Sequence, residues 1–238
     1  MGARWVMVTF ALVHGAGDGG WAWHRVQQAL HARGHASVAP DLPTDREDAT
    51  WDDCADAMLA ALDGTPRGDA LVVVGHSAGS MIVPLVAARA SAVLQVHVVG
   101  LVPRPGESPM DWFEAVGWAD AVEQAARQDG GLTGHADPMV AFYPDVPRVL
   151  ARLALARERP TSTALGETPW SGPDVSDVPA RYVVTARDRF IPPAVQRRVA
   201  AERLGITDPD VVQTGHCAAL ADPGALADLL TGYVERAA

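Results

Sequence analysis

The chain has 238 residues and 48% hydrophobic content, enough for an α/β domain with an insertion and its own core, which excludes a disordered protein. A formal net charge of -10, with no compensating basic cluster, argues against nucleic acid or an anionic membrane surface as a partner. All 19 basic residues are arginine, and the absence of lysine excludes Schiff-base chemistry and a lysine general base.

The first predicted element is a buried strand, WVMVTFALV, at residues 5–13. It is too short for a membrane span and lacks the charged start and small-residue cleavage site of a leader peptide. Cys54 and Cys217 are too few for a disulfide framework and do not have metal-ligand spacing. We therefore expect a cytoplasmic protein without a metal, and arginine-only usage indicates a GC-rich bacterial genome.

The loop that follows, VHGAGDGGWAWH, contains Gly15, Gly17 and Gly20 in the G-x-G-x-x-G spacing of a dinucleotide-binding turn. About 20 residues further on, Asp41 closes a second apolar run at 36–40, where such a fold places its ribose-binding acid. A glycine fingerprint alone is a weak signal, so a nucleotide cofactor needs support from the rest of the chain.

A second glycine motif follows a predicted helix and strand. Residues 50–63 have one apolar face, with Thr50 as N-cap, and the apolar run ALVVVG at 70–75 leads into GHSAG. A helical pattern comes directly after. G-x-S-x-G between a strand and a helix predicts a sharp turn that exposes Ser77 as a nucleophile.

A long interval separates the next two strands. The run QVHVVGLV at 95–102 contains His97, interpreted as a core residue, and no strand-like run occurs between 104 and 178. Helical patterns fill this interval, so we predict a helical cap at 104–178 inserted into a core formed by 1–103 and 179–238. Short apolar runs alternating with helices predict an α/β fold around a mainly parallel sheet.

The last strands provide an acid and a base for the serine. Asp188 follows the strand at 181–186, and His216 follows the strand at 210–214, with a helix at 193–204 between them. Catalytic groups gather beyond the carboxyl ends of such strands, and the order Ser, Asp, His is that of a hydrolase triad. We therefore predict that Asp188 orients His216 as the general base.

The glycine loop then has a different role. A serine that attacks a carbonyl forms an oxyanion, which is stabilised by the N–H after the nucleophile and by another from a loop after an early strand. Ala78 and Ala16 are the predicted donors. A dinucleotide site would leave the three triad residues unexplained, so we expect no cofactor.

Six segments resemble the α/β-hydrolase superfamily, in particular the small-capped group of plant-type methylesterases, hydroxynitrile lyases and their bacterial relatives. They are LVHGAGDGGWAWHRV, APDLP, VVVGHSAGSMIV, VPRPGES, ARDRFIP and GHCAALADPGAL, in that order along the chain. The resemblance implies an α/β-hydrolase fold with about six strands, and ester hydrolysis. Lyase members resemble one another in a lysine beside the catalytic histidine and an oxyanion-loop threonine; Cys217 and Gly15 stand here instead.

The substrate is predicted as a small apolar or aromatic ester. Cap side chains that could line a pocket are Met110, Trp112, Phe113, Trp118, Met139, Phe142, Tyr143 and Trp170. Of these we single out Trp112, Phe113, Trp118 and Phe142 as substrate-binding residues. Two alternatives stay open: a C–C-bond hydrolase or lyase with the same triad, and a ligand-binding module with a vestigial triad. The sequence also leaves open a homodimer.

Overall fold

A computed structural model describes residues 7–65, 68–172 and 177–235 of the chain. Its centre is a six-stranded sheet in the order β2-β1-β3-β4-β5-β6, and each recorded pairing is parallel. The strands are β1 (Val8–Val13), β2 (Ala36–Val38), β3 (Ala70–His76), β4 (Leu94–Val98), β5 (Ala180–Thr185) and β6 (Asp210–Val212). The predicted α/β architecture and strand number are confirmed.

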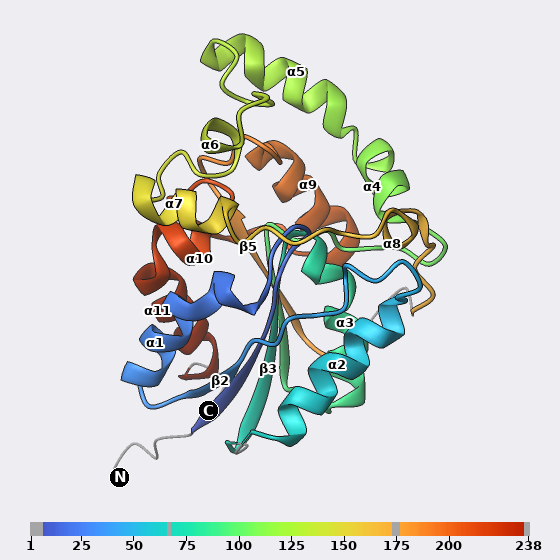
Figure 1. Cartoon of the computed structure of the whole chain (residues 1–238), viewed down its shortest axis with the longest axis vertical. Helices are drawn as coiled ribbons and strands as arrows, with labels where there is room; N and C mark the ends of the chain where they lie inside the picture. The colour runs from blue at the N-terminus through green and yellow to red at the C-terminus, as the bar shows by residue number, and fades with distance from the viewer. Residues whose placement is uncertain (1–6, 66–67, 173–176, 236–238) are drawn as a thin grey trace.

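Helices cover both faces of the sheet (Figure 1). The core helices are η1 (Gly20–Trp23), α1 (His24–Ala32), α2 (Trp51–Asp63), η2 (Ser77–Met81), α3 (Val83–Arg89), α9 (Pro193–Leu204), α10 (Ala218–Ala221) and α11 (Pro223–Glu235). Helices α1 and α11 pack together on one face, whereas α2 and α3 pack together on the other. This arrangement buries the central strands β1, β3 and β4 on both sides, which explains their continuous apolar runs, whereas the edge strands β2 and β6 are only partly buried.

Two helices begin where their sequence signals place them. Thr50 caps α2, because its hydroxyl accepts from Asp53 N–H while the Asp53 carboxylate accepts from Thr50 N–H. Helix α9 starts at Pro193, whose missing N–H is not needed in a first turn. The strand predicted at 5–13 starts later in the structure, at Val8, and its first residues, Trp5 and Val6, lie outside the described residues.

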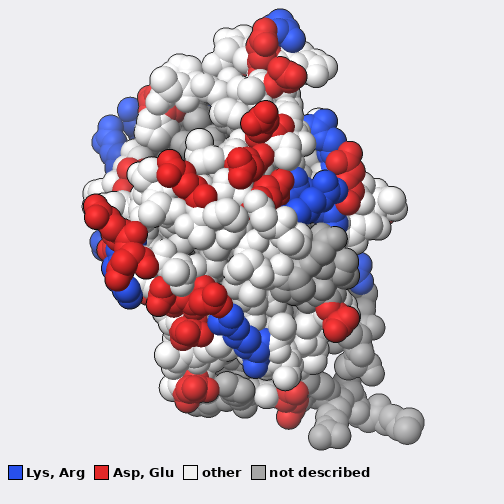
Figure 2. All heavy atoms as spheres, turned by 90° about the vertical axis from the view of Figure 1, so that its right-hand side faces the viewer, with Lys and Arg blue, Asp and Glu red and all other residues white. Residues whose placement is uncertain are grey.

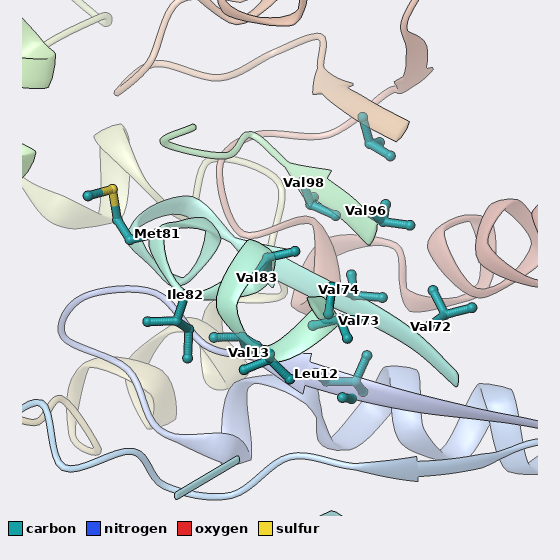
Figure 3. Packing of buried hydrophobic residues seen from close by; sticks show 14 of the residues in the cluster. Leu12, Val13, Val72, Val73, Val74, Met81, Ile82, Val83, Val96 and Val98 are labelled. Atoms are coloured by element: carbon teal, nitrogen blue, oxygen red, sulfur yellow. The ribbon is translucent and has the colours of Figure 1, made fainter. Parts of the chain in front are cut away.

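The core is built from branched side chains of adjacent strands. Figure 3 shows valines from β3 and β4 packed with side chains from β1 and from the segment after β3. The labelled residues are Leu12, Val13, Val72, Val73, Val74, Met81, Ile82, Val83, Val96 and Val98, and each is at most 2% exposed. This packing makes the strand ends rigid supports for the loops that follow them.

The interval between β4 and β5 contains α4 (Pro109–Ala115), α5 (Trp118–Asp129), α6 (Pro138–Ala141), α7 (Arg148–Leu155) and α8 (Thr163–Glu167). No strand occurs among the described residues of this interval. The helices lie beyond one end of the sheet, at the top of Figure 1. The division into core and cap remains a prediction.

The distribution of surface charges and the length of the helices are relevant to binding of nucleic acid and to membranes. On the face shown in Figure 2, Asp and Glu side chains are dispersed among neutral atoms, and Arg side chains form only small groups. Binding to a polyanion is not tested by this one face, and the absence of a nucleic-acid partner stays a prediction. Among the described helices, none is both long and apolar enough to cross a bilayer.

Candidate active site

Ser77 lies on a strained turn between β3 and η2. Its φ of 50° is in the left-handed region, which costs a non-glycine residue energy. The flanking glycines leave the space that this turn needs: a Cβ on Gly75 would lie 2.4 Å from Val83 Cγ2, and one on Gly79 would lie 2.3 Å from His14 O. The turn is the strand-to-helix elbow that the G-x-S-x-G motif predicts.

Asp188 is a fully engaged buried carboxylate, 3% exposed, in the loop after β5. Oδ1 accepts from Phe190 N–H at 2.8 Å and Ile191 N–H at 2.9 Å. Oδ2 accepts from Thr185 Oγ1 at 2.9 Å, Gln196 Nε2 at 3.3 Å and His216 Nδ1 at 2.9 Å. Every one of these neighbours donates, so the Asp188 carboxylate acts only as an acceptor here.

His216 is held in one orientation from several sides. Nδ1 donates to Asp188 Oδ2, and its carbonyl accepts from His76 Nε2 at 3.0 Å. The rings of Phe142 and Phe190 lie 5.4 and 5.2 Å from the imidazole, centroid to centroid. With Nδ1 as the donor, a neutral His216 leaves Nε2 free to accept a proton.

Ser77 is linked to this pair through its chain neighbour His76 and makes no direct hydrogen bond to it. No hydrogen bond of Ser77 Oγ occurs among the described residues, although Ser77 is 7% and His216 4% exposed. The adjacent His76 ring packs against His216 at 4.9 Å. Hydrogen bonds of a nucleophile to its base are often longer without substrate, so this geometry is compatible with a triad.

The loop after β1 has its backbone oriented by His14. Nδ1 of His14 donates to Gly15 O at 2.9 Å, and Nε2 accepts from Leu42 N–H at 3.0 Å. Burial lowers the pKa of His14, which keeps the ring neutral and this pattern intact. Because Gly15 O and Ala16 N–H belong to one peptide, fixing the carbonyl also fixes the direction of the N–H.

The same loop is tied to the core and to the segment after α7. Gly20 N–H donates to Asp41 Oδ1 at 2.7 Å, and a Cβ at Gly20 would lie 1.9 Å from Ala39 O. Gly17 N–H donates to Thr161 Oγ1 at 2.9 Å. The residues that resemble a dinucleotide fingerprint therefore brace this loop. Among the described residues, no group of three His, Cys, Asp or Glu side chains could hold a metal ion.

The predicted substrate-binding aromatics lie in two different environments. Trp112 is completely buried, and its Nε1 donates to Val102 O at 3.2 Å, so it packs in the core. Phe113 and Trp118 pack at 5.2 Å in a cluster with Phe190. Phe142 alone of the four reaches the His216 ring. Contact with substrate remains a prediction for all four.

Phe190 and a pocket beside Ala16 and Ala78 were not predicted from the sequence. Phe190 lies two residues after Asp188 in ARDRFIP. This nearness to the predicted acid was the one sequence signal that could have placed it beside His216. The pocket is lined by His14, Gly15, Ala16, Leu42, Thr44, Trp51, Cys54, Ala78, Gly79, Ile82, Thr161 and Leu165. These residues come from segments far apart in the chain, and no local pattern joins them.

A second carboxyl, Asp18, lies near His216. It lines a small cavity with His76, Cys217 and the indole of Trp23, whose Nε1 has no partner among the described residues. Burial, and secondarily the charge of Glu158, raise the pKa of Asp18 to about 6, whereas His216 acts in the opposite direction. The neighbouring Tyr143 and Cys217 have raised pKa values because of burial and remain neutral.

Replacing Asp18 with Asn is expected to move the acid limb of kcat/KM to lower pH. The ionised carboxylate stabilises the His216 imidazolium, so its removal lowers the pH below which the base is protonated. Glu114→Gln, which removes an equal charge from the exposed face of α4, is the control. An unchanged limb in both variants would contradict the assignment.

The same substitution is expected to raise the melting temperature at neutral pH. The pKa of Asp18 in the folded protein, about 6, exceeds the ordinary value of 3.8, so the folded state holds this proton more tightly than the unfolded state. Stability therefore falls as pH rises from about 4 through 6, and the ionised carboxylate is a cost above that window. The gain from Asn is absent near pH 4, which thermal melts at the two pH values measure.

Comparison with known proteins places the chain in a family. A profile described as the alpha/beta hydrolase family matches residues 10–229. Methylesterase 18 of Arabidopsis thaliana is 26% identical over 220 residues, which cover 81% of this chain and 84% of the relative. Methylesterase 2 of the same plant is also 26% identical, covering 95% of each chain. The solved structure of the Arabidopsis methylesterase MES16, at 19% identity, superimposes with a TM-score of 0.72 over 96% of this chain and 99% of its own, which shows the shared fold.

Proposed function

The chain belongs to the alpha/beta hydrolase family, and from this premise we propose that it hydrolyses small carboxylic esters through Ser77, His216 and Asp188. Relatives named methylesterases, matched over most of their length, support ester cleavage as the reaction. The observation that carries the proposal is the buried 2.9 Å hydrogen bond between His216 and Asp188, beside a serine on a strained elbow. A buried, oriented imidazole next to such a serine is the arrangement that nucleophilic acyl transfer requires.

In the first half of the reaction, His216 Nε2 takes the hydroxyl proton as Ser77 Oγ bonds to the ester carbonyl carbon. The carbonyl π electrons move to oxygen, where the N–H groups of Ala16 and Ala78 stabilise the negative charge. The intermediate collapses, the bond to the alcohol oxygen breaks, and the His216 proton passes to the departing alcohol. Asp188 stabilises the imidazolium throughout without taking its proton.

In the second half, water attacks the acyl group on Ser77 and gives its proton to His216. The tetrahedral intermediate releases the carboxylic acid, and the proton returns to Ser77 Oγ. The two backbone donors act again on the same oxygen. No cofactor enters this scheme, because Ser77, His216 and the two backbone donors supply the nucleophile, the proton transfers and the charge stabilisation.

Two positions in the site argue against cyanohydrin cleavage. Cys217 follows the histidine, and a thiol carries no positive charge in either protonation state; burial raises its pKa, so it stays neutral. At Gly15, a Cβ would lie 3.1 Å from His76 Nδ1 and 3.2 Å from Ser77 Cβ. A larger side chain in the oxyanion loop would need its neighbours to move, so the site favours ester hydrolysis over the lyase reaction.

The test combines a panel of 4-nitrophenyl esters with a serine-reactive phosphonate. We expect turnover of the esters, and a single phosphonate adduct that peptide mass spectrometry assigns to Ser77. Cleavage of a diketone or cyanohydrin without ester turnover would favour the C–C reaction instead. Saturable binding with no turnover and no adduct would indicate a ligand-binding module.

A further inference from the structure

A narrow pocket opens beside the two proposed oxyanion donors. Ala16 and Ala78 both line it, together with side chains from the segment after β2, from α2 and from α8. Its volume is about 30 Å³. Since a cavity of roughly 10 to 15 Å³ on this measure holds one water molecule, the pocket has room for about two or three groups of methyl size.

The lining is apolar, and none of its described residues carries a formal charge. Leu42, Trp51, Ile82 and Leu165 supply most of the apolar surface, each at most 6% exposed. His14 is neutral with both ring nitrogens engaged. The pocket would therefore reject a charged group and accept a small uncharged one.

One hydroxyl in the lining has no partner. Thr44 Oγ1 makes no hydrogen bond with any residue that the structure describes, although Thr44 is only 9% exposed. The other lining hydroxyl, on Thr161, accepts from Gly17 N–H. An unpaired buried hydroxyl costs free energy, so a ligand oxygen placed beside Thr44 would recover a hydrogen bond.

The pocket and His216 are built from different strand ends, and His216 is not one of the residues that line the pocket. The pocket is built by segments that follow β1, β2 and β3, whereas Asp188 and His216 follow β5 and β6 at the other edge. His216 must protonate the leaving alcohol, so the alcohol departs on the histidine side. The acyl group is then directed toward the pocket, and the alcohol toward Phe142 and Phe190.

We propose that this pocket is the acyl site, and that the substrates are uncharged esters of a short acyl group, about two to four carbon atoms, with a larger apolar or aromatic alcohol. This inference rests on the proposed function and names its substrate class. A methyl ester of a large acid has the opposite distribution, with a large acyl group and a small alcohol, so the proposal predicts that such an ester is a poor substrate. Thr44 adds a preference for one uncharged oxygen in the acyl chain.

Two isomeric esters test the orientation. Benzyl acetate and methyl phenylacetate contain the same atoms and have alcohols of similar acidity, but they exchange the positions of the small and the aromatic group. We expect kcat/KM to be at least about tenfold higher for benzyl acetate, since fit to an apolar pocket discriminates to this extent. Equal values, or a preference for methyl phenylacetate, would overturn the proposal.

Failure of this inference can be distinguished from failure of the proposed function. A reversed preference with turnover that depends on Ser77, and with phosphonate labelling intact, overturns only the assignment of the acyl site. Loss of turnover for both isomers, together with no labelling of Ser77, overturns the proposed function and the inference that rests on it.

Two variants examine the pocket wall. Cys54→Met adds volume at a lining residue, whereas Met58→Leu, one turn further along α2, changes a buried side chain outside the lining. We expect Cys54→Met to reduce kcat/KM for benzyl butanoate by about tenfold or more and for benzyl acetate by less than about threefold. Equal losses for the two esters would contradict the pocket's role, and thermal melts of both variants exclude a folding defect.

Thr44→Val keeps the shape of the side chain and removes its hydroxyl. Benzyl methoxyacetate and benzyl butanoate differ in one ether oxygen in place of a methylene, so their ratio of kcat/KM isolates the hydrogen bond. We expect the substitution to lower this ratio by about fivefold to tenfold, as for a single hydrogen bond to a buried group. An unchanged ratio would remove Thr44 from the proposal.

Discussion

Replacement of Ser77 by alanine is expected to lower kcat for ester hydrolysis by about 10⁴- to 10⁶-fold, as in other serine hydrolases that lose their nucleophile. The reason is that no other hydroxyl occupies the elbow beside His216, and without a covalent step only binding and the oxyanion donors remain. The measurement is kcat on a 4-nitrophenyl ester with purified protein. Activity within about tenfold of the parent enzyme would contradict the nucleophile assignment.

Ser77→Gly provides a matched comparison, because it removes the same hydroxyl and also relieves the backbone. Ser77 has a φ of 50°, where alanine is as strained as serine and glycine is not. We therefore expect both variants to be inactive, with the glycine variant more stable than the alanine variant by about 1 kcal/mol. Since Ser77 Oγ has no recorded hydrogen bond among the described residues, neither variant should unfold.

The fold was predictable because the central strands β1, β3 and β4 are buried on both faces. Short unbroken apolar runs then indicate strands, and longer segments between them, such as α2 with its one apolar face, indicate helices. The ends of strands were less predictable. The run expected to continue to residue 102 ends as β4 at Val98, because Val99 adopts a φ of 44° and leaves the strand. A valine carries no sequence signal for this turn; the next residue, Gly100, lies where a Cβ would come within 2.2 Å of Ser80 Oγ.

The chemistry of the site was more predictable than its shape. A nucleophile elbow has a local sequence pattern, and an acid and a base at the ends of later strands follow from chain order. The pocket has no such pattern, because Leu42, Thr44 and Trp51 meet Ala16 and Ala78 only after the sheet has formed. From sequence alone, Trp51 is interpreted as a core side chain on the apolar face of an amphipathic helix.

The environment of Asp18 was also not predictable from local sequence. An aspartate in a glycine-rich loop reads as a solvated charge, and nothing local reveals that His216 lies near it. Its environment depends on η1 and on the loop after β6, which are nearly 200 residues apart. Because these segments meet only in the folded structure, the sequence did not reveal the electrostatic interaction between Asp18 and His216.

Replacement of Asp188 by asparagine is expected to reduce kcat by about 10⁴-fold, because it reverses the tautomer of His216. Each neighbour of the carboxylate is a donor: two backbone N–H groups reach Oδ1, while His216, Thr185 and Gln196 reach Oδ2. Asparagine keeps its oxygen toward the two N–H groups and turns its NH₂ toward the imidazole. His216 Nδ1 must then accept, the ring proton moves to Nε2, and the base can no longer take the proton of Ser77.

The control for this variant is Asp208→Asn, at an exposed loop aspartate before β6. It removes an equal charge and should leave kcat within about twofold, as expected of a surface substitution without partners. The proton position on His216 can be observed directly by ¹⁵N NMR of the imidazole, with Nδ1–H in the parent enzyme and Nε2–H in Asp188→Asn. A variant that keeps the Nδ1–H signal and still loses activity would show that Asp188 acts through charge and not through the tautomer. A variant with full activity would remove Asp188 from the mechanism, because no other described acceptor lies within hydrogen-bond distance of that nitrogen.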